Sequence, residues 1–385
     1  MRYVKEKSMD KRKKVLFIHN SLPEYRIEFW KKLSALVDLK LIITSGKLAK
    51  KIYGLEGNTN GLDLVYWNFK DKKFLKKMIN KYECVILPPA DSLKEIVVCQ
   101  YVCKLCKENK IPYIYWTEKW ETKLEYQPIK KQIKNRIQRA IIYKLCKNAT
   151  ICVAAGKKSR EYYLNMGIES TKIYVAVDSS TSPKGKKYED IKQKFNMETE
   201  SKVILYLGRI VERKGCHILI QALDRILKEN KAYLLIAGDG DQKQQCIDLT
   251  KRMSEEDRII FCGKIQPDER KNYYLQSDLF VLPSFSLGGV CEAWGLTVNE
   301  ALECGTPVIA TTAVGSAYDL IDDKNGFLVQ ENNIDELKKA ISMFFMNYDL
   351  YDRKEIMERY DRFSVDAMAK EFSKAIEAAV SKNRR

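Results

Sequence analysis

Two glutamates eight positions apart, Glu292 and Glu300, flank a segment in which a loop leads into a short helix. We expect this helix from about Gly295 to Cys304, because Gly305 suits the left-handed position past a helix end and Pro307 prevents continuation. The N–H groups at the start of such a helix attract a phosphate. A carboxylate beside a bound diphosphate is unfavourable unless it accepts hydroxyl groups. The two glutamates therefore predict a ligand that carries both phosphate and a polyol.

A basic loop forms the second candidate site. Gly208–Gly215 follows directly after the apolar run Val203–Leu207, which predicts a strand. Ligands of doubly wound sheets bind outside the carboxyl ends of the strands, where this loop would lie. Arg209 offers a planar fork for phosphate oxygens, and Lys214 offers a point charge. At about 4 Å from a leaving phosphate, each cation would contribute roughly 4 kcal/mol at an effective dielectric near 20.

Apolar strands alternate with amphipathic helices, which is typical of parallel sheets covered by helices on both faces. In the first half, the predicted strands are Val15–His19, Lys40–Thr44, Cys84–Leu87 and Tyr113–Trp116, and the predicted helices are Phe29–Val37, Lys73–Lys81 and Ser92–Lys107. In the second half, the predicted strands are Val203–Leu207, Tyr233–Ala237, Ile259–Cys262, Leu279–Leu282 and Val308–Thr311, with a helix over Cys216–Glu229.

A chain of 385 residues is longer than one hydrophobic core usually spans. The composition shifts around Ser179–Tyr188, where a turn-rich stretch has no periodicity. We therefore predict a first Rossmann-like domain over residues 1–180, a linker over 181–198 and a second such domain over 199–360. Residues 361–385 are predicted to form a helix that could pack back on the first domain. Two α/β domains joined in this way imply a cleft between them, where ligands commonly bind.

Composition excludes several classes of protein. With 45% hydrophobic and 31% charged residues, the chain is globular rather than disordered. No stretch approaches the roughly 20 apolar residues of a membrane-crossing helix, and no signal-peptide core is visible, so we expect a cytoplasmic protein. The eleven cysteines are expected to be reduced. Cys99, Cys103 and Cys106 share a helix face, but the sequence has no paired C-x-x-C knuckles. We therefore predict that they are buried thiols and that they bind no metal. The net charge of +17 suits nucleic acid, a nucleotide substrate or an acidic membrane, or is simply a solvated surface.

The two candidate sites together resemble a known enzyme family. The run from Glu292 to Glu300 is similar to the E-x7-E motif of retaining family 4 glycosyltransferases, in the branch with the frame Glu-x-Trp-Gly-Leu-x-Val-Asn-Glu-Ala. The other matching stretches are Gly208–Gly215, which resembles the donor-phosphate loop of that family, Asp278–Ser284 and Gly305–Ala310. The resemblance is strongest over residues 203–329 and weaker in the first half.

The resemblance implies a GT-B fold, in which two Rossmann-like domains face each other across a cleft, and a reaction that needs neither metal nor cofactor. It implies transfer of a sugar, with retention, from a nucleotide diphosphate sugar to a saccharide or lipid-linked acceptor in the assembly of surface polysaccharide, capsule or lipopolysaccharide. Glu300 would then hold the donor ribose, Glu292 would contact the transferred sugar, and Arg209 and Lys214 would neutralise the diphosphate. The further donor-binding residues that it implies are Gly208, Gly295, Leu296, Thr297 and Lys264.

The first domain should carry the acceptor. The segment His19–Arg26 follows the first predicted strand and should line the cleft; its end resembles a Pro-x-Tyr-Arg variant of the family, where many members have a glycine-rich loop. Arg26 could reach a phosphate of the acceptor or cap local structure. The family's His-Gly pair is missing after Tyr113–Trp116, where Glu118 could contact the acceptor hydroxyl. The candidate acceptor-side residues are His19, Tyr25, Arg26 and Glu118.

A basic amphipathic helix is predicted next in the chain. Its apolar residues recur every fourth position, at Ile129, Ile133, Ile137, Ile141 and Leu145, and its basic residues are Lys130, Lys131, Lys134, Arg136, Arg139, Lys144 and Lys147. This pattern fits a helix packed on the core with a solvated back. It equally fits a helix that rests on anionic lipid, which would bring the protein to the inner face of the cell membrane.

Other functions stay open on the sequence. A GT-B sugar-nucleotide epimerase or a phosphorylase would share the expected architecture, although no convincing site for a lysine-bound pyridoxal phosphate is visible. A catalytically silent GT-B partner subunit is disfavoured because Arg209, Lys214 and Glu300 are intact. Nucleic-acid binding would explain the charge but not the cleft residues. A nicotinamide dehydrogenase is disfavoured because no G-x-G-x-x-G follows the first strand.

Overall fold

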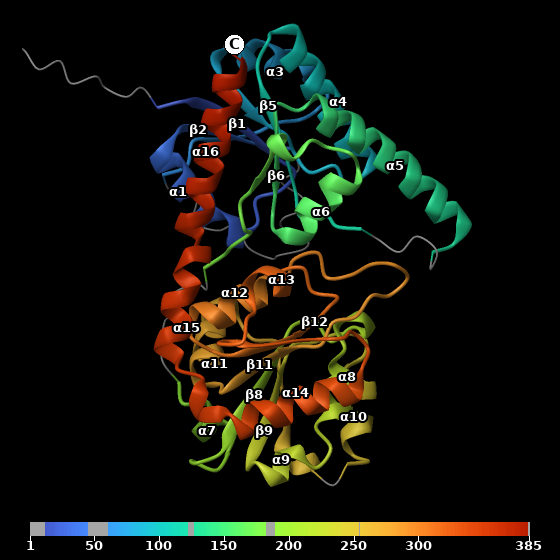
Figure 1. Ribbon diagram of the computed structural model, residues 1–385, viewed down its shortest axis with the longest axis vertical. Coiled ribbons are helices and arrows are strands. Elements are labelled where there is room, and N and C mark those ends of the chain that lie inside the picture. Colours follow the sequence, from blue (N-terminus) through green and yellow to red (C-terminus); the bar gives the residue numbers. More distant parts are fainter. Residues whose placement is uncertain (1–11, 45–60, 122–126, 182–188, 254, 384–385) are drawn as a thin grey trace, which may run out of the picture.

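The computed structural model describes residues 12–44, 61–121, 127–181, 189–253 and 255–383 (Figure 1). They form two α/β domains, one above the other in Figure 1, and each domain is built on one sheet of parallel strands. This arrangement confirms the predicted class of two Rossmann-like domains.

The sheet of the first domain has the strand order β3-β2-β1-β4-β5-β6-β7, and all its paired strands are parallel. Its strands are β1 Lys14–His19, β2 Asp38–Ile43, β3 Leu64–Tyr66, β4 Cys84–Ile86, β5 Tyr113–Thr117, β6 Ile151–Ala154 and β7 Ile173–Val175. Its helices are α1 Glu24–Leu36, α3 Lys72–Met78, α4 Leu93–Glu108, α5 Ile129–Asn148 and α6 Lys157–Asn165. The four predicted strands are confirmed, whereas β3, β6 and β7 were not predicted.

The sheet of the second domain has the strand order β10-β9-β8-β11-β12-β13 and is also parallel throughout. Its strands are β8 Lys202–Leu207, β9 Ala232–Ala237, β10 Ile259–Gly263, β11 Leu279–Leu282, β12 Val308–Thr311 and β13 Gly326–Val329. Its helices are α7 Ile191–Lys194, α8 Cys216–Ala222, α9 Ile226–Glu229, α10 Lys243–Thr250, α11 Arg270–Gln276, α12 Leu296–Glu303, α13 Ala317–Leu320, α14 Ile334–Met346 and α15 Arg353–Tyr360. Of the predicted linker over 181–198, residues 182–188 lie outside the described ranges.

Two predicted helices were placed wrongly. The helix expected over Cys216–Glu229 is broken into α8 and α9, because Arg225 adopts a left-handed conformation with φ of 68°. After the break, Ile226 and Leu227 pack in the same buried cluster as the side chains of α8. The helix expected from Phe29 begins at Glu24 instead, directly after Pro23, and Arg26 in its first turn is buried.

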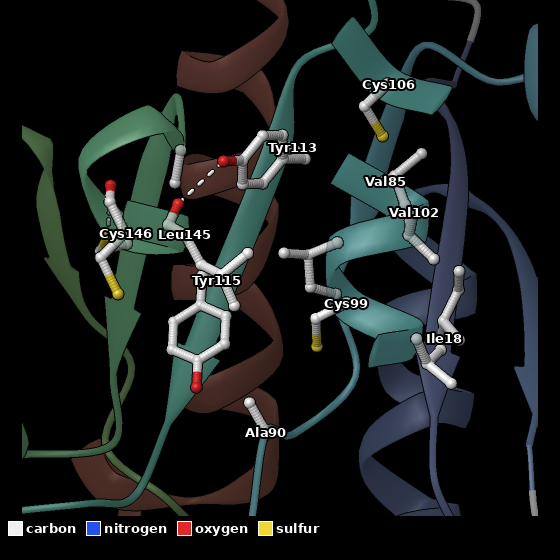
Figure 2. Packing of buried hydrophobic residues seen from close by; sticks show 14 of the residues in the cluster. Ile18, Val85, Ala90, Cys99, Val102, Cys106, Tyr113, Tyr115, Leu145 and Cys146 are labelled. Atoms are coloured by element: carbon white, nitrogen blue, oxygen red, sulfur yellow. Dashed lines mark hydrogen bonds between the residues drawn. The ribbon is translucent and has the colours of Figure 1, made fainter. Parts of the chain in front are cut away.

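Each sheet has an apolar cluster on both faces, so helices cover all four faces. Figure 2 shows one of these clusters, in which Cys99, Val102 and Cys106 of α4 pack with Val85 of β4 and Ile18 of β1. Burial raises the pKa of the Cys99 and Cys106 thiols well above the ordinary value, so both stay protonated. These thiols therefore act as apolar packing groups.

The last helix of the chain, α16 (Val365–Asn383), returns to the first domain and runs beside α1 (Figure 1). Its buried side chains recur at helical spacing: Val365, Met368, Ala369, Phe372, Ala375, Ile376, Ala379 and Val380. The Phe372 ring centroid lies 4.9 Å from that of Phe29 in α1. The chain thus crosses between the domains twice, once before α7 and once before α16.

Candidate active site

The carboxyl ends of all six strands of the second sheet lie along one edge, because the strands are parallel. Chain order reverses between β8 and β11, which are neighbours in this sheet. Ligands of open α/β sheets bind at such a switch point. The loop after β8 contains Arg209 and Lys214, and the loop after β11 contains Glu292. The basic loop and the first glutamate of the sequence motif therefore meet at the expected position.

Three glycines allow these loops to approach one another closely. Gly215 has φ of 68°, and a Cβ atom there would lie 2.0 Å from the carbonyl oxygen of Pro283. A Cβ atom on Gly238, which follows β9, would lie 1.8 Å from the carbonyl oxygen of Gly208. A Cβ atom on Gly295 would approach side chains of β11 and of the loop after β12. Larger residues at these positions would force the loops apart.

Glu292 is held by two cations. Its Oε2 atom lies 2.6 Å from Nζ of Lys214 and 2.7 Å from Nη1 of Arg213. Although burial alone would raise it, the pKa of Glu292 is lowered by Lys214 and Arg213. The pKa of Lys214 is lowered, first by burial and then by the positive charges of Arg213 and Arg209, against the opposing effect of Glu292. Two cations thus contact this carboxylate, and the charge of the exposed Arg209 acts on Lys214.

Helix α12 begins beside this ion pair. A Cβ atom on Gly295, the residue before α12, would lie 3.5 Å from Cγ of Glu292. The N–H groups of Leu296 and Thr297, at the first positions of the helix, have no carbonyl partner within it. The structure therefore brings Gly295, Glu292 and the basic loop together. Lys264, also expected to bind the donor, is exposed just after β10 at the same edge.

Glu300 lies one turn further along α12 and is almost fully buried. Its Oε2 atom accepts a hydrogen bond of 3.0 Å from the Tyr274 hydroxyl, and its Oε1 atom is 3.5 Å from Nη1 of Arg270. Burial raises the pKa of Glu300, while Arg270 and the Tyr274 hydrogen bond oppose the shift. Both partners belong to α11, and nothing in the sequence indicated their role. Glu300 is thus oriented toward α11 and does not contact Glu292.

A buried polar network links α12 to both segments in which the chain crosses between the domains. Asn299 accepts a hydrogen bond of 2.9 Å from the Trp294 indole and donates to the Asp178 carbonyl (3.0 Å) and to the Tyr360 hydroxyl (3.1 Å). The Ser179 hydroxyl lies 3.1 Å from that of Tyr360. Asn299 belongs to the frame that carries the family resemblance, but sequence reasoning gave it no role. It links α12 to the two segments in which the chain passes between the domains.

Arg26 does not face open solvent in the cleft. It is 1% exposed and forms a bidentate ion pair with Asp178, in which Nη2 lies 2.6 Å from Oδ2. The same Nη2 is 2.5 Å from Oε1 of Glu118, and the guanidinium lies over the Trp116 ring. Arg26 thus joins the first turn of α1, the end of β5 and the segment in which the chain crosses to the second domain. The pKa of Glu118 is raised by burial and by the charge of Asp178, although Arg26 opposes this.

The other two acceptor-side candidates surround this cluster. His19 is buried, its Nδ1 atom lies 2.8 Å from the Ser21 carbonyl oxygen, and burial lowers its pKa to about 4. The ring is therefore neutral near pH 7. The Tyr25 ring centroid lies 5.1 Å from Cζ of Arg26. His19 is the last residue of β1, and Tyr25 and Arg26 lie in the first turn of α1, so the structure brings all three, with Glu118, to the carboxyl edge of the first sheet.

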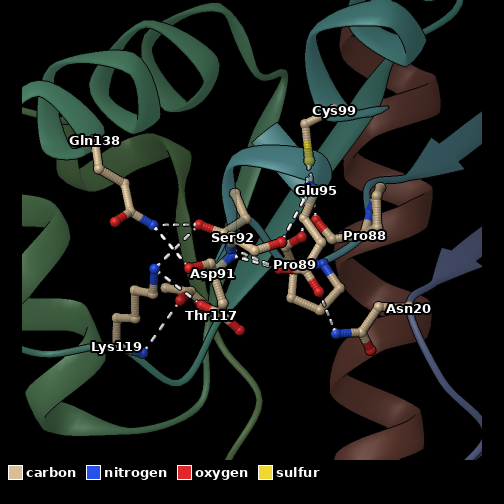
Figure 3. Close-up of polar contacts among 11 residues, drawn as sticks. Asn20, Pro88, Pro89, Asp91, Ser92, Glu95, Cys99, Thr117, Lys119 and Gln138 are labelled. Atoms are coloured by element: carbon tan, nitrogen blue, oxygen red, sulfur yellow. Dashed lines mark hydrogen bonds and ion pairs between the residues drawn. The ribbon is translucent and has the colours of Figure 1, made fainter. Parts of the chain in front are cut away.

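Polar contacts fix the loops at this edge (Figure 3). The Asn20 amide donates to Oε1 of Glu95 (2.6 Å), and the Glu95 carboxylate also caps α4. Nζ of Lys119 lies 2.9 Å from Oδ1 of Asp91, and Gln138 of α5 donates to the Ala90 carbonyl at 2.9 Å. The loops after β1, β4 and β5 and the helix α5 are thus held together.

Metal ligation has no support among the described residues. No group of three or more histidine, cysteine, aspartate or glutamate side chains in these ranges is arranged to hold a metal ion.

Comparison with known proteins agrees with this geometry. Residues 187–362, which include the second domain, match the family model of glycosyl transferases group 1. An uncharacterized glycosyltransferase of Methanocaldococcus jannaschii, MJ1607, is 29% identical over 187 residues, which make up 47% of this chain and 46% of that protein. The lipopolysaccharide core biosynthesis glycosyltransferase LpsE of Rhizobium meliloti is 28% identical over 160 residues, which make up 42% of this chain and 44% of that protein. The chain therefore matches less than half the length of these curated relatives.

The fold extends further than the sequence similarity. The crystal structure of Anabaena Alr3699/HepE in complex with UDP has a TM-score of 0.74 to this protein, covering 94% of this chain and 99% of that chain at 16% identity. This likeness confirms the predicted GT-B fold for both domains.

Proposed function

We propose that the protein is a retaining glycosyltransferase that moves a sugar from a nucleotide diphosphate sugar to a saccharide or lipid-linked acceptor in surface polysaccharide or lipopolysaccharide assembly. The observation that carries this proposal is the meeting of Lys214, Arg213 and Glu292 at the start of α12. The group 1 domain, the LpsE likeness and the UDP bound to the Anabaena protein support it.

The residues take roles that follow from charge and position. Arg209 and Lys214 would bind the diphosphate together with the N–H groups that open α12. Arg213, which the sequence did not single out, would share this role because it faces the same carboxylate. Glu292 would accept hydroxyls of the transferred sugar, and Glu300 would accept those of the ribose. The donor would thus lie along the carboxyl edge of the second sheet.

In the transfer step, the bond between the anomeric carbon and the phosphate oxygen breaks, and its electron pair stays with the diphosphate. The acceptor hydroxyl oxygen bonds to the anomeric carbon on the same face, and its proton passes to the departing phosphate oxygen. Positive charge that is fixed before the reaction stabilises this developing anion. No metal is required in this scheme, so activity should persist in EDTA.

An epimerase or a silent partner subunit would use the same fold. Incubation with UDP-, GDP-, ADP- and dTDP-sugars, one at a time, distinguishes them by slow release of the nucleoside diphosphate. A transferase releases the diphosphate, an epimerase interconverts the sugar nucleotide instead, and a silent subunit does neither. Absence of release with every donor, in the presence of a lipid extract as acceptor source, would contradict the proposal.

Peripheral contact with an anionic membrane is a further part of the proposal. Ile129, Ile133 and Ile137 of α5 are 74%, 53% and 58% exposed, among lysines and arginines of the same helix. Such a face inserts readily among anionic lipids. Within the described ranges, none of the helices has the length and apolar character needed to cross a bilayer.

The test is sedimentation with vesicles of phosphatidylglycerol or of phosphatidylcholine. We expect binding to the anionic vesicles, and loss of binding in the double variant Ile133→Asp and Ile137→Asp. Leu350→Asp, at a residue of the second domain that is 72% exposed, serves as the matched control. Equal binding of wild type and double variant would exclude α5 as the contact.

A further inference from the structure

A pocket of about 670 Å³ lies at the end of the first domain that faces away from the second domain. Its walls come from the C-terminal halves of α4 and α5, the segment that leads into β5, and Asn383 at the end of α16, near the C-terminus marked in Figure 1. Tyr113, the first residue of β5, also lines it, so the pocket opens at the amino edge of the first sheet. The candidate active site lies at the carboxyl edges of the sheets. We call this separate cavity the amino-edge pocket.

The more buried part of the lining is apolar and forms the floor of the pocket. Its members are Cys103, Cys106, Ile111, Pro112, Ile141 and Leu145. The Tyr113 hydroxyl donates to the Leu145 carbonyl at 2.8 Å, as Figure 2 shows, so this polar group is already satisfied. Burial raises the pKa of Cys103 to about 12, and its thiol therefore carries no charge near neutral pH. The floor thus suits a hydrocarbon group.

The exposed part of the lining is basic. It contains no aspartate or glutamate and has four lysines from three separate segments: Lys104, Lys107, Lys110 and Lys144. Among the described residues, only Lys104 has an acidic partner, because its Nζ atom lies 3.8 Å from Oε1 of Glu108. Both of these side chains are exposed, and such a pair contributes little. The pocket therefore carries a positive charge that its own lining does not balance.

The four lysines are not needed to satisfy the ends of the two helices. Lysines near a helix C-terminus commonly bond to its last carbonyl groups, but here backbone N–H groups occupy those acceptors. The Cys106 carbonyl accepts from the Ile111 N–H at 2.9 Å, and the Cys146 carbonyl accepts from the Ala149 N–H at 3.1 Å. None of the four ammonium groups donates a hydrogen bond within the part of the chain that the structure describes. They are therefore available to a ligand.

The apolar floor continues along α5. Ile141 lines both the amino-edge pocket and a second pocket of about 270 Å³, whose other apolar lining residues are Leu93, Ile133 and Ile137. These three side chains are exposed. Since α4 and α5 are in contact, a hydrocarbon chain that begins near the lysines can lie in the groove between the two helices.

We propose that the amino-edge pocket binds an amphiphilic phosphate, with its phosphate among Lys107, Lys110 and Lys144 and its apolar part on Ile141 and Leu145. Lysine ammonium groups bind phosphate as point charges, and the floor and groove select a ligand that also has an apolar part. A membrane phospholipid and a soluble organic phosphate both have this chemistry. The inference does not depend on the proposed sugar transfer, because the pocket lies at the opposite edge of the sheet from the cleft.

Calorimetric titration with octyl phosphate tests the site, and inorganic phosphate and octanol probe the charge and the chain alone. Octyl phosphate should bind about tenfold or more tightly than either, with UDP absent or present. The double variant Lys107→Gln and Lys144→Gln should weaken this binding about tenfold or more. The matched control, Lys76→Gln and Lys77→Gln, removes two exposed lysines of α3 outside the lining and should bind as the wild type does.

Sedimentation with vesicles of phosphatidylcholine that contain phosphatidate identifies the source of the phosphate. Loss of sedimentation in the Lys107, Lys144 double variant alone indicates a membrane lipid, whereas equal behaviour of all three proteins, with the difference in octyl phosphate binding intact, indicates a soluble organic phosphate. The proposal is overturned if octyl phosphate binds no tighter than inorganic phosphate or octanol, or if UDP displaces it. Equal affinity in wild type and in the double variant, at the same melting temperature, would also overturn it.

Discussion

Replacing Glu292 by glutamine should have opposite effects on product binding and on turnover. The carboxylate of Glu292 neutralises Lys214 and Arg213. Glutamine keeps the size of the side chain but removes its charge, so the cations would be available to a diphosphate. We therefore expect UDP to bind more tightly to Glu292→Gln, although the sugar loses its carboxylate contact.

The magnitude follows from the distances. At the 2.6 Å between Nζ of Lys214 and Oε2 of Glu292, the Coulomb attraction is ~6 kcal/mol at an effective dielectric of 20. A phosphate oxygen ~4 Å beyond the lysine would lie roughly 6–7 Å from Glu292, where repulsion between unit charges is ~2.5 kcal/mol at that dielectric. Screening reduces this repulsion, so the expected gain in UDP affinity is about ten- to fiftyfold.

Calorimetric titration of UDP into both proteins measures the gain, and release of UDP from the accepted donor measures turnover. Turnover should fall by roughly 10²–10³, as it does when one group that stabilises the transition state is lost. Glu358→Gln, at an exposed residue of α15, is the matched control for removal of one negative charge. Unchanged or weaker UDP binding in Glu292→Gln, in a protein with wild-type melting temperature, would refute the idea that phosphate lies beside this ion pair.

Three further outcomes are expected. Glu300→Ala should weaken UDP binding. Tyr274→Phe removes a hydrogen bond that opposes the rise in the pKa of Glu300, so UDP binding should fall more steeply as pH decreases. Unchanged UDP binding in both variants would exclude the role of Glu300 at the ribose. The pKa of His19 is about 4 in the folded protein, below its unfolded value of 6.5, so the unfolded chain takes up a proton between these pH values and ~3 kcal/mol of stability is lost on acidification. The free energy of unfolding in urea should therefore fall less for His19→Phe than for the wild type between pH 7 and 4.5. An equal loss in both proteins would contradict the burial of a neutral His19. The pKa of Glu118 is raised to about 8 from 4.5, so between these pH values the folded protein retains a proton that the unfolded chain releases, and stability falls as pH rises. Glu118→Gln should make the free energy of unfolding less dependent on pH in this range. An unchanged pH dependence would show that Glu118 is ionised in the folded protein.

Much of the second domain could be predicted because its strands are short apolar runs between clear turn residues. Leu279–Leu282 and Val308–Thr311 have the predicted bounds. Gly305 has φ of 69°, in agreement with the expected end of α12. The break between α8 and α9 could not be predicted, because burial of Ile226 and Leu227 against the sheet, rather than any turn residue, decides it.

The site was predictable only where its residues are close in sequence. The basic loop contains three cations, and the sequence does not show that Arg213 rather than Arg209 contacts Glu292. That choice depends on the left-handed Gly215 packed against Pro283. The ion pair between Arg26 and Asp178 joins residues 152 positions apart. Only the return of the chain at the domain crossing brings them together.

The central claim is that the carboxyl edge of the second sheet binds a nucleoside diphosphate through a helix start and a cluster of cations. Calorimetric titration with UDP, GDP and ADP in EDTA, on wild type and on Arg209→Ala, tests it most directly. We predict that at least one diphosphate binds the wild type at a ratio of one to one and that Arg209→Ala weakens this binding about tenfold or more. Absence of binding for all three nucleotides, or equal affinity in the two proteins, would contradict the account.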